Sequence, residues 1–225
     1  MAIRNTTFIL CSLILFFAGC QKKEVQLPLI DLPGISEIQN HSSIWVFMET
    51  KNGEIIANLN KGNKILNTHW IYNIDRRLPM KEVVPVLIAM QENKNKDSMH
   101  KKEGMKSYFS YADTKSNSIS LLLFGQTNFI SDTEAPNILK ELRENTCTAI
   151  IELIDDEIKL DGKRQTLTDL KSNLKKGQQC AGEEKLRVML MFDEDTSYQN
   201  YLELKVYLHA NDIHCESAEY FHTVK

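Results

Sequence analysis

The stretch that decides the fold is LRVMLMF at residues 186–192, followed directly by DEDTSYQN at residues 193–200. The first part is apolar almost without interruption, which is typical of a strand buried on both faces at the centre of a sheet. Residues 197–210 then have the apolar spacing of a helix that returns antiparallel to this strand, and residues 213–221 indicate a final strand. The C-terminal part of the chain therefore predicts a sheet with a helix packed on one face.

Outward from this stretch, the other apolar segments are short and are separated by turn residues. Asn52-Gly53 is predicted to be a hairpin turn, and Thr166 and Asp169 resemble a capping box at the start of a helix. Strands are predicted at residues 44–48, 54–59, 69–74, 108–111, 119–124, 148–154 and 157–160, and helices from about residue 79, at residues 137–144 and from residue 166 to Gly177.

Two segments of the chain have the same order of elements. In the first, a strand reaches Asp75, a short polar turn follows, and a helix and a strand come next; in the second, Asp193 occupies the same place. Sequence identity between the segments is slight, so the hypothesis of a duplication rests on the order of elements. We predict an α+β fold of two small two-layer modules, at residues 43–132 and 133–225, each with a mixed sheet and helices on one face.

The polar turns after these strands contain the main candidate site residues. Because an aspartate between strand and helix can accept backbone N–H groups, Asp75 and Asp193 are predicted to form helix-capping turns and not to be catalytic. Arg76 and Arg77 would expose two guanidinium groups able to bind a carboxylate, and are a candidate interaction surface, with an ordinary solvated turn as the alternative. The acidic run at residues 193–195 lacks the alternating ligands of a calcium loop and is predicted to be a solvated turn.

The N-terminal segment has the pattern of a lipoprotein signal. Arg4 provides a positive charge, residues 8–17 (FILCSLILFF) are almost entirely apolar, and small residues precede Cys20. The apolar run is shorter than the roughly 20 residues of a spanning helix, although an uncleaved anchor is the alternative. FFAGC resembles the lipobox of bacterial lipoproteins, with Phe where Leu is more usual. We predict a signal peptide at residues 1–19, a lipidated Cys20 and an extended tether over residues 20–42.

The composition gives no sign of nucleic-acid binding or of enzymatic chemistry. The net charge is −3, and −4 once Arg4 is removed, whereas nucleic-acid-binding proteins carry a basic patch. The sequence has no phosphate-binding loop, no nucleophile elbow and no His/Cys pairing at a catalytic or metal-ligand spacing. We therefore predict a protein that is not an enzyme and has no metal and no cofactor.

Several aromatic, histidine and cysteine residues each have two interpretations. Trp45 and Trp70 could form a platform for a sugar ring, but their apolar neighbours favour core packing. His69 is predicted to be a strand-end histidine with a hydrogen-bonded ring. The mature chain retains three cysteines, either as one disulfide with a spare thiol or as three buried thiols: Cys147, Cys180 and Cys215.

Residues 147–222 resemble the periplasmic domain of the ExbD/TolR biopolymer-transport family. The resemblance rests on a strand hairpin with a Gly, the LTDL segment at residues 167–170, the apolar strand that ends at Asp193, and the aromatic Tyr198. Residues 29–125 resemble a more divergent copy. Members of that family carry a transmembrane helix with an Asp that takes part in proton-driven work, whereas the apolar run of this chain contains no acid, which argues against a motor subunit.

The resemblance implies an envelope module that dimerises or binds cell-wall or transport components. We expect a non-catalytic, lipid-anchored protein of the cell envelope that faces the periplasm. Its expected partners are the membrane, through the lipid anchor, and an envelope protein or peptidoglycan; a homodimer is compatible with this role, and nucleic acid is not expected. The alternative is a ligand-binding lipoprotein exposed on the cell surface.

Overall fold

The computed structural model describes residues 24–60, 62, 64–95, 103–131, 141, 147–176 and 186–222. The predicted signal peptide, Cys20, Cys180 and all but one residue of the predicted helix at residues 137–144 lie outside these ranges. Within them, no helix combines the length and the apolar character needed to cross a membrane.

The first sheet has six strands in the order β1-β5-β4-β2-β3, with β6 paired to β5. β2, β4 and β5 are parallel, whereas the hairpins β2–β3 and β5–β6 are antiparallel. A helix, α2 (Met80–Asn95), connects β4 to β5. The strands are β1 (Leu29–Ile30), β2 (His41–Lys51), β3 (Glu54–Leu59), β4 (His69–Ile74), β5 (Ser107–Asp113) and β6 (Ser118–Phe124).

The second sheet also has six strands, in the order β10-β9-β8-β11-β12-β7. β7, β8, β11 and β12 are parallel, and the hairpins β8–β9 and β9–β10 are antiparallel. The helices are α4 (Leu167–Lys176), before β11, and α5 (Tyr198–Ala210), between β11 and β12. The strands are β7 (Asn128–Ser131), β8 (Thr148–Ile154), β9 (Glu157–Leu160), β10 (Lys163–Gln165), β11 (Arg187–Asp193) and β12 (Ala218–His222).

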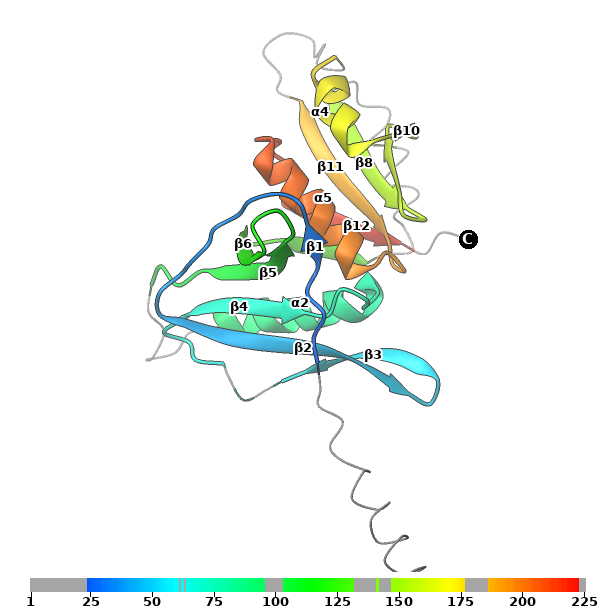
Figure 1. Cartoon of the computed structure of the whole chain (residues 1–225). Helices are drawn as coiled ribbons and strands as arrows, with labels where there is room; N and C mark the ends of the chain where they lie inside the picture. Colours follow the sequence, from blue (N-terminus) through cyan, green and yellow to red (C-terminus); the bar gives the residue numbers. More distant parts are fainter. Residues whose placement is uncertain are drawn as a thin grey trace, which may run out of the picture.

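The two sheets follow the same plan, as Figure 1 shows. The hairpin β2–β3 corresponds to β8–β9, and the unit β4–α2–β5 corresponds to β11–α5–β12. In each unit the helix serves as the crossover that two neighbouring parallel strands require. The prediction of an α+β fold with two mixed sheets and helices packed on them is confirmed.

The two modules share one hydrophobic core. Helix α5 lies between the sheets in Figure 1, and the core cluster contains side chains of both sheets and of α2, α4 and α5. Aromatic rings cross the boundary between the modules: Phe109 of β5 meets Tyr198 of α5 edge-on, with 5.9 Å between ring centroids. Because neither module encloses its core alone, we expect the two to unfold together.

Residues 26–35 are part of the folded body, so the prediction of an extended tether as far as residue 42 is wrong for this part. The Arg76 N–H donates to the Gln26 carbonyl at 2.8 Å, and the Ala112 N–H donates to the Pro28 carbonyl at 2.8 Å. Further on, Ile35 forms an antiparallel bridge with Leu121 of β6. A sheet edge offers unpaired N–H and C=O groups, and this segment satisfies some of them.

The boundary between modules also differs from the expected one. β7 precedes the predicted boundary at 132/133, yet it pairs in parallel with β12 of the second sheet. The final strand begins at Ala218, later than predicted, because residues 213–216 form an irregular connection from α5. The boundary difference arises because β7 pairs with a strand far along the sequence.

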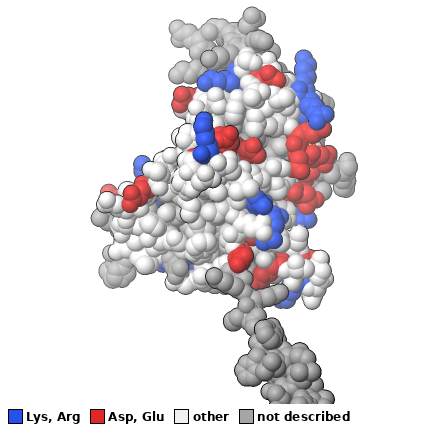
Figure 2. All heavy atoms as spheres, viewed as in Figure 1, with Lys and Arg blue, Asp and Glu red and all other residues white. Residues whose placement is uncertain are grey.

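Charged side chains are distributed unevenly over the surface. Figure 2 shows acidic groups gathered along the side of the second sheet, whereas the face over β2, β4 and β5 of the first sheet is almost free of charge in this view. α2 lies behind these strands in Figure 1, so this is the face of the sheet that points away from the core.

Candidate functional site

The loops that carry the predicted site residues lie against each other. We call residues 75–81 and 193–199 the repeat junction, since they follow the equivalent strands β4 and β11. An antiparallel bridge joins Pro79 to Ser197, its counterpart in the other repeat. On either side, the Met80 N–H donates to the Thr196 carbonyl and the Tyr198 N–H to the Leu78 carbonyl, each at 2.8 Å.

A second pair of hydrogen bonds extends the same pattern. The Lys81 N–H donates to the Glu194 carbonyl at 2.8 Å, and the Gln199 N–H donates to the Arg76 carbonyl at 3.1 Å. Exchanging the two repeats maps each bond onto its partner, so a local two-fold relates the loops. The first backbone N–H groups of α2 and α5 have no intrahelical acceptor and are thus partly satisfied by the opposite repeat.

Asp75 is completely buried at this junction. Its carboxylate accepts the backbone N–H of Arg77 at 3.1 Å and that of Gln26 at 3.3 Å. The Arg77 guanidinium donates to the two carboxylate oxygens at 2.8 and 2.7 Å. Burial by itself raises the pKa of Asp75, but these hydrogen bonds and the charge of Arg77 outweigh it and hold the pKa below its usual value.

Asp193 forms the equivalent turn with fewer partners. Its carboxylate accepts the backbone N–H of Asp195 at 3.0 Å. Both aspartates accept the N–H two residues on and close the turn before the helix, as predicted, but neither caps the helix itself. The N-cap of α5 is Ser197, whose hydroxyl accepts the Asn200 N–H. The prediction that the aspartates cap the helices is therefore wrong: four residues separate each aspartate from the first residue of its helix.

The predicted pair Arg76 and Arg77 does not form one exposed surface. The Arg77 guanidinium is held by Asp75, although its side chain remains 42% exposed. The Arg76 guanidinium is partly buried and makes no ion pair with another residue of the described part of the chain. Of these two arginines, Arg76 is therefore the one whose cation is available for a partner.

Other candidate residues take up local structural roles. His69 accepts the Lys106 N–H on its Nδ1 at 3.0 Å, which confirms a strand-end histidine with a hydrogen-bonded ring. Asp195 of the acidic run forms a 2.7 Å ion pair with Lys81. Across the described ranges, no three His, Cys, Asp or Glu side chains are grouped in a way that could hold a metal ion.

The two tryptophans differ in environment. Trp70 lies in the core with 0% exposure, as predicted, and its indole N–H donates to the Ile65 carbonyl at 2.8 Å. Trp45 is only half-buried, although its neighbours Ile44 and Val46 are fully buried. Its side chain points to the opposite face of β2, so the prediction of core packing is wrong for Trp45.

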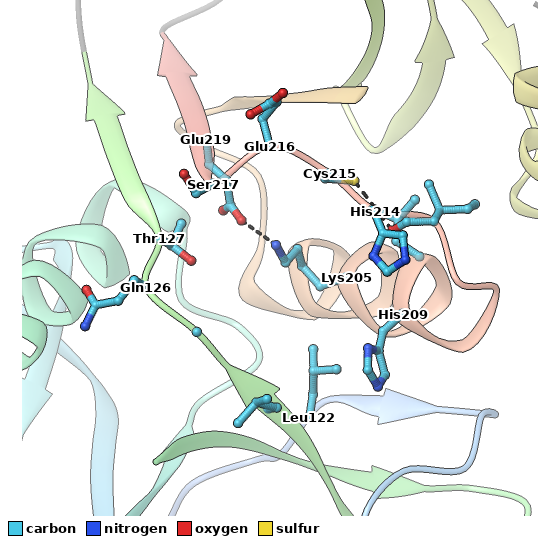
Figure 3. Close-up of a pocket in the computed structure, with 14 residues that line it drawn as sticks. Leu122, Gln126, Thr127, Lys205, His209, His214, Cys215, Glu216, Ser217 and Glu219 are labelled. Atoms are coloured by element: carbon cyan, nitrogen blue, oxygen red, sulfur yellow. Dashed lines mark hydrogen bonds and ion pairs between the residues drawn. The ribbon is translucent and has the colours of Figure 1, made fainter. Parts of the chain in front are cut away.

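A pocket that the sequence did not reveal lies between the modules, at the end of α5. We call it the α5–β12 pocket; its volume is about 290 Å³. In Figure 3, Lys205 extends toward Glu219, His209 and His214 lie at the end of the helix, and Gln126 and Thr127 come from the opposite side. These residues are scattered over the sequence with no common spacing, so no motif could have indicated the pocket.

Glu219 is the buried acid of this pocket, at 1% exposure. Tyr201 donates its hydroxyl to Glu219 at 2.9 Å, and Lys205 forms an ion pair with the same carboxylate. Both partners come from α5, so the three groups connect α5 to β12. A buried charge with two hydrogen-bonding partners is satisfied structurally.

The cysteines of the described part differ in state. Cys147 is disulfide-bonded, whereas Cys215 is a free thiol at the edge of the α5–β12 pocket. Burial and the nearby Glu219 raise the pKa of Cys215 to about 11, although Lys205 opposes the shift. Because the thiol is protonated at neutral pH, it is a poor nucleophile. Of the two interpretations, one disulfide with a spare thiol agrees with these states.

Comparisons with protein-family models, with curated proteins and with solved structures found no match for this chain. The resemblance of residues 147–222 to ExbD/TolR periplasmic domains therefore stays a prediction.

Proposed function

We propose that the chain is a non-catalytic, lipid-anchored protein of the cell envelope, facing the periplasm, that acts through contacts with protein or cell-wall partners. The observation that carries the proposal is the position of Cys20. Cys20 directly follows an apolar run and two small residues. Gln26, six residues later, is already hydrogen-bonded to Asp75 and Arg76 of the folded body. Acyl chains on Cys20 would hold this body at the bilayer, at about 0.8 kcal/mol per buried CH₂.

The pairing of the polar groups supports a non-catalytic role. The Asp75 carboxylate accepts hydrogen bonds from two backbone N–H groups and a guanidinium. Glu219 is paired with Tyr201 and Lys205. A general acid or base needs an unshared position next to a substrate, which these groups do not offer.

The architecture also supports a relation to the ExbD/TolR periplasmic domains in tandem. Both sheets combine a hairpin with a strand–helix–strand unit, in the order that the resemblance implies for each copy. The apolar run at residues 8–17 contains no acid, so the proposed role excludes proton-driven work within the membrane.

The test of the anchor is the mass of the protein purified from membranes. We expect an N-terminus at Cys20 that carries the mass of attached lipid. Cys20→Ala should abolish the lipid mass and leave the precursor uncleaved, whereas Cys11→Ala, in the same apolar run, should change nothing because that residue leaves with the signal peptide. An unmodified chain that retains Met1 in the wild type would overturn the proposal.

The test of the interaction role is capture of partners from crosslinked envelopes, with peptidoglycan fragments included. Arg76→Glu reverses the one junction cation that has no carboxylate partner among the described residues, so it should weaken capture of an acidic partner. Lys171→Glu, a charge reversal on α4, is the matched control. Equal capture by wild type and Arg76→Glu would remove Arg76 from the interface.

The α5–β12 pocket favours a second candidate, a ligand-binding lipoprotein exposed on the surface. At about 290 Å³ it lies just below the roughly 300 Å³ at which small-ligand sites begin, and it combines apolar walls with His209, His214 and Lys205. Protease treatment of intact cells separates the two candidates: a surface protein is cut, whereas a protein that faces the periplasm survives.

A further inference from the structure

The first sheet has an apolar face that points away from the core. In β2, Ile44 and Val46 point into the core at 0% exposure, and Trp45 between them points to the other side. In β6, Leu122 and Phe124 belong to the core cluster, so the alternate residues of that strand share the face of Trp45. We call this side the outer face of the first sheet.

The centre of the outer face is itself a small hydrophobic cluster. Ile71, Tyr108 and Leu121 come from β4, β5 and β6 and are each less than 9% exposed, with Ile38 packed against them. Alternation along β4, β5 and β6 places no Lys, Arg, Asp or Glu on this face. The residues that these three strands place on it are His69, Ile71, Asn73, Tyr108, Ser110, Ala112, Ile119, Leu121 and Leu123.

Around this centre, large aliphatic side chains are exposed to solvent. Leu29, Ala112 and Ile119 stand in register across β1, β5 and β6, with Leu29 48% and Ile119 57% exposed. Leu123 of β6 is 41% exposed, as is Ile35, which forms a bridge with Leu121 of the same strand. Figure 2 shows few charged groups over this face. A contiguous exposed apolar surface of this kind marks an interaction site.

The second sheet shows that the outer face need not be open. Its corresponding residues, Ile150, Met189 and Met191, form a cluster with exposures of 1%, 3% and 1%. Both clusters are buried at their centres, but among the described residues only the cluster of the first sheet is surrounded by exposed aliphatic side chains. Features that only the first copy has should therefore indicate what covers its outer face.

The place where the chain leaves the body indicates that occupant. Gln26 is six residues after Cys20, and Leu29, on the outer face, is nine residues after it. At about 3.3–3.6 Å per residue, a fully extended chain spans at most about 20 Å to Gln26 and about 30 Å to Leu29. A lipid on Cys20 therefore keeps the outer face within one bilayer-core thickness of the membrane surface.

We infer that the outer face of the first sheet rests on the surface of the bilayer that holds the lipid anchor. The inference depends on the proposed lipidation of Cys20. Over β4, β5 and β6 this face carries no charged side chain, which suits neutral phospholipid, whereas Glu49 and Lys51 share the side of Trp45 at the far end of β2. The half-buried Trp45 suits the membrane–water boundary, where one end is apolar and the other wet. The short tether raises the effective concentration of the outer face at the membrane surface. Weak apolar contacts are therefore enough to orient the body.

The chain carries its own reporter for this arrangement. It has two tryptophans, Trp45 on the outer face and Trp70 in the core. The mature lipidated protein is reconstituted into phosphatidylcholine vesicles, with and without bromine on the acyl chains as a fluorescence quencher. We expect bromine to remove about half of the Trp45 emission, because an interfacial side chain reaches the acyl boundary. Trp45→Phe, which leaves only the core Trp70, should lose this quenching.

Two matched variants test the apolar contact. Ile119→Glu places a charge on the outer face and should reduce quenching to the level of Trp45→Phe while the protein stays lipid-anchored. Ile88→Glu changes an aliphatic residue of α2 with 37% exposure, on the core side of the sheet, and should quench like the wild type.

The outcomes separate this inference from the proposed function. A lipidated wild type whose emission is unaffected by brominated lipid overturns membrane docking and leaves the anchor intact. A protein without lipid mass overturns the proposed function instead. If crosslinking places two copies face to face through Ile119 and quenching is absent, the occupant is a second copy and the inference is wrong.

Discussion

Replacing Asp75 by Asn tests whether the repeat junction stabilises the fold. The substitution keeps the shape of the side chain but removes the charge that faces Arg77. It also places an amide NH₂ group among donors, since Asp75 accepts from Gln26 N–H, Arg77 N–H and the Arg77 guanidinium. At least one of these donors, whose hydrogen bonds are partly buried, then loses its acceptor.

The expected loss can be worked from these contacts. A hydrogen bond to a charged group contributes about 1.5–3 kcal/mol, and removing one partner of a buried ion pair costs about 3–5 kcal/mol. The Arg77 side chain is 42% exposed, so its guanidinium regains water and the loss falls below that upper range. We expect Asp75→Asn to lower the free energy of unfolding by about 2–3 kcal/mol, and Tm by roughly 4–10 °C.

The assay is urea unfolding of the mature chain, followed by circular dichroism. Asp193→Asn is the matched control, because Asp193 occupies the same place in the other repeat and accepts the Asp195 N–H without a guanidinium partner among the described residues. Its expected loss is about 1 kcal/mol or less. Because both modules share the core, each variant should unfold in one transition with an unchanged urea dependence.

The pH dependence provides a second readout. The pKa of Asp75 is lower in the folded state than in the unfolded chain, so its contribution is fully present above the unfolded pKa of about 3.9 and is lost as the pH falls through the folded value. The difference between wild type and Asp75→Asn should therefore be constant from pH 7 to about pH 5 and shrink below about pH 4.

Two results would refute this reasoning about the junction. Equal losses for Asp75→Asn and Asp193→Asn would mean that the Arg77 pair adds nothing. A loss of less than about 0.5 kcal/mol for Asp75→Asn would place the substitution among ordinary surface changes, despite its complete burial.

Three further predictions follow from local contacts. Ser197→Ala should lower the free energy of unfolding by about 1 kcal/mol in the same urea assay, because it removes the N-cap of α5. Burial lowers the pKa of Lys94 to about 8, and its Nζ lies 4.3 Å from the centre of the Trp70 ring. In Trp45→Phe, where all tryptophan emission comes from Trp70, the fluorescence should therefore change with a midpoint near pH 8. Adding Lys94→Met should abolish this pH-dependent change. Cys215, with its pKa raised to about 11, should be alkylated slowly at pH 8 in the folded protein and rapidly in urea, as measured by mass spectrometry.

Local sequence patterns predicted the elements that local physics determines. The strand at residues 69–74 and those at 148–154 and 157–160 were predicted with their observed bounds, since each is a short apolar or alternating run between turn residues. The order of elements around Asp75 and Asp193 predicted two equivalent units, which the register of the two sheets bears out.

Features that depend on distant pairing could not be predicted in this way. β1 has only two residues and gains its structure from β5, far along the sequence. Trp45 stands in the run SIWVFM, where both faces of the strand are apolar and alternation gives no direction. The first backbone N–H groups of α2 and α5 donate to carbonyls of the opposite repeat. The sequence pointed to Asp75 as the cap of α2 because it is close in the sequence, and this was incorrect.

The pattern of differences between the two repeats argues for separate roles. In a symmetric pair of separate chains, both copies of each residue would have to serve the same purpose. Within one chain, Asp75 has an arginine partner whereas Asp193 has none among the described residues, and β1 pairs with the first sheet. The outer faces differ in the same sense, since among the described residues exposed aliphatic side chains surround the cluster of the first sheet alone. The face with exposed aliphatic side chains belongs to the copy nearest Cys20, so the proposed lipidation of Cys20 would bring a membrane surface within its reach.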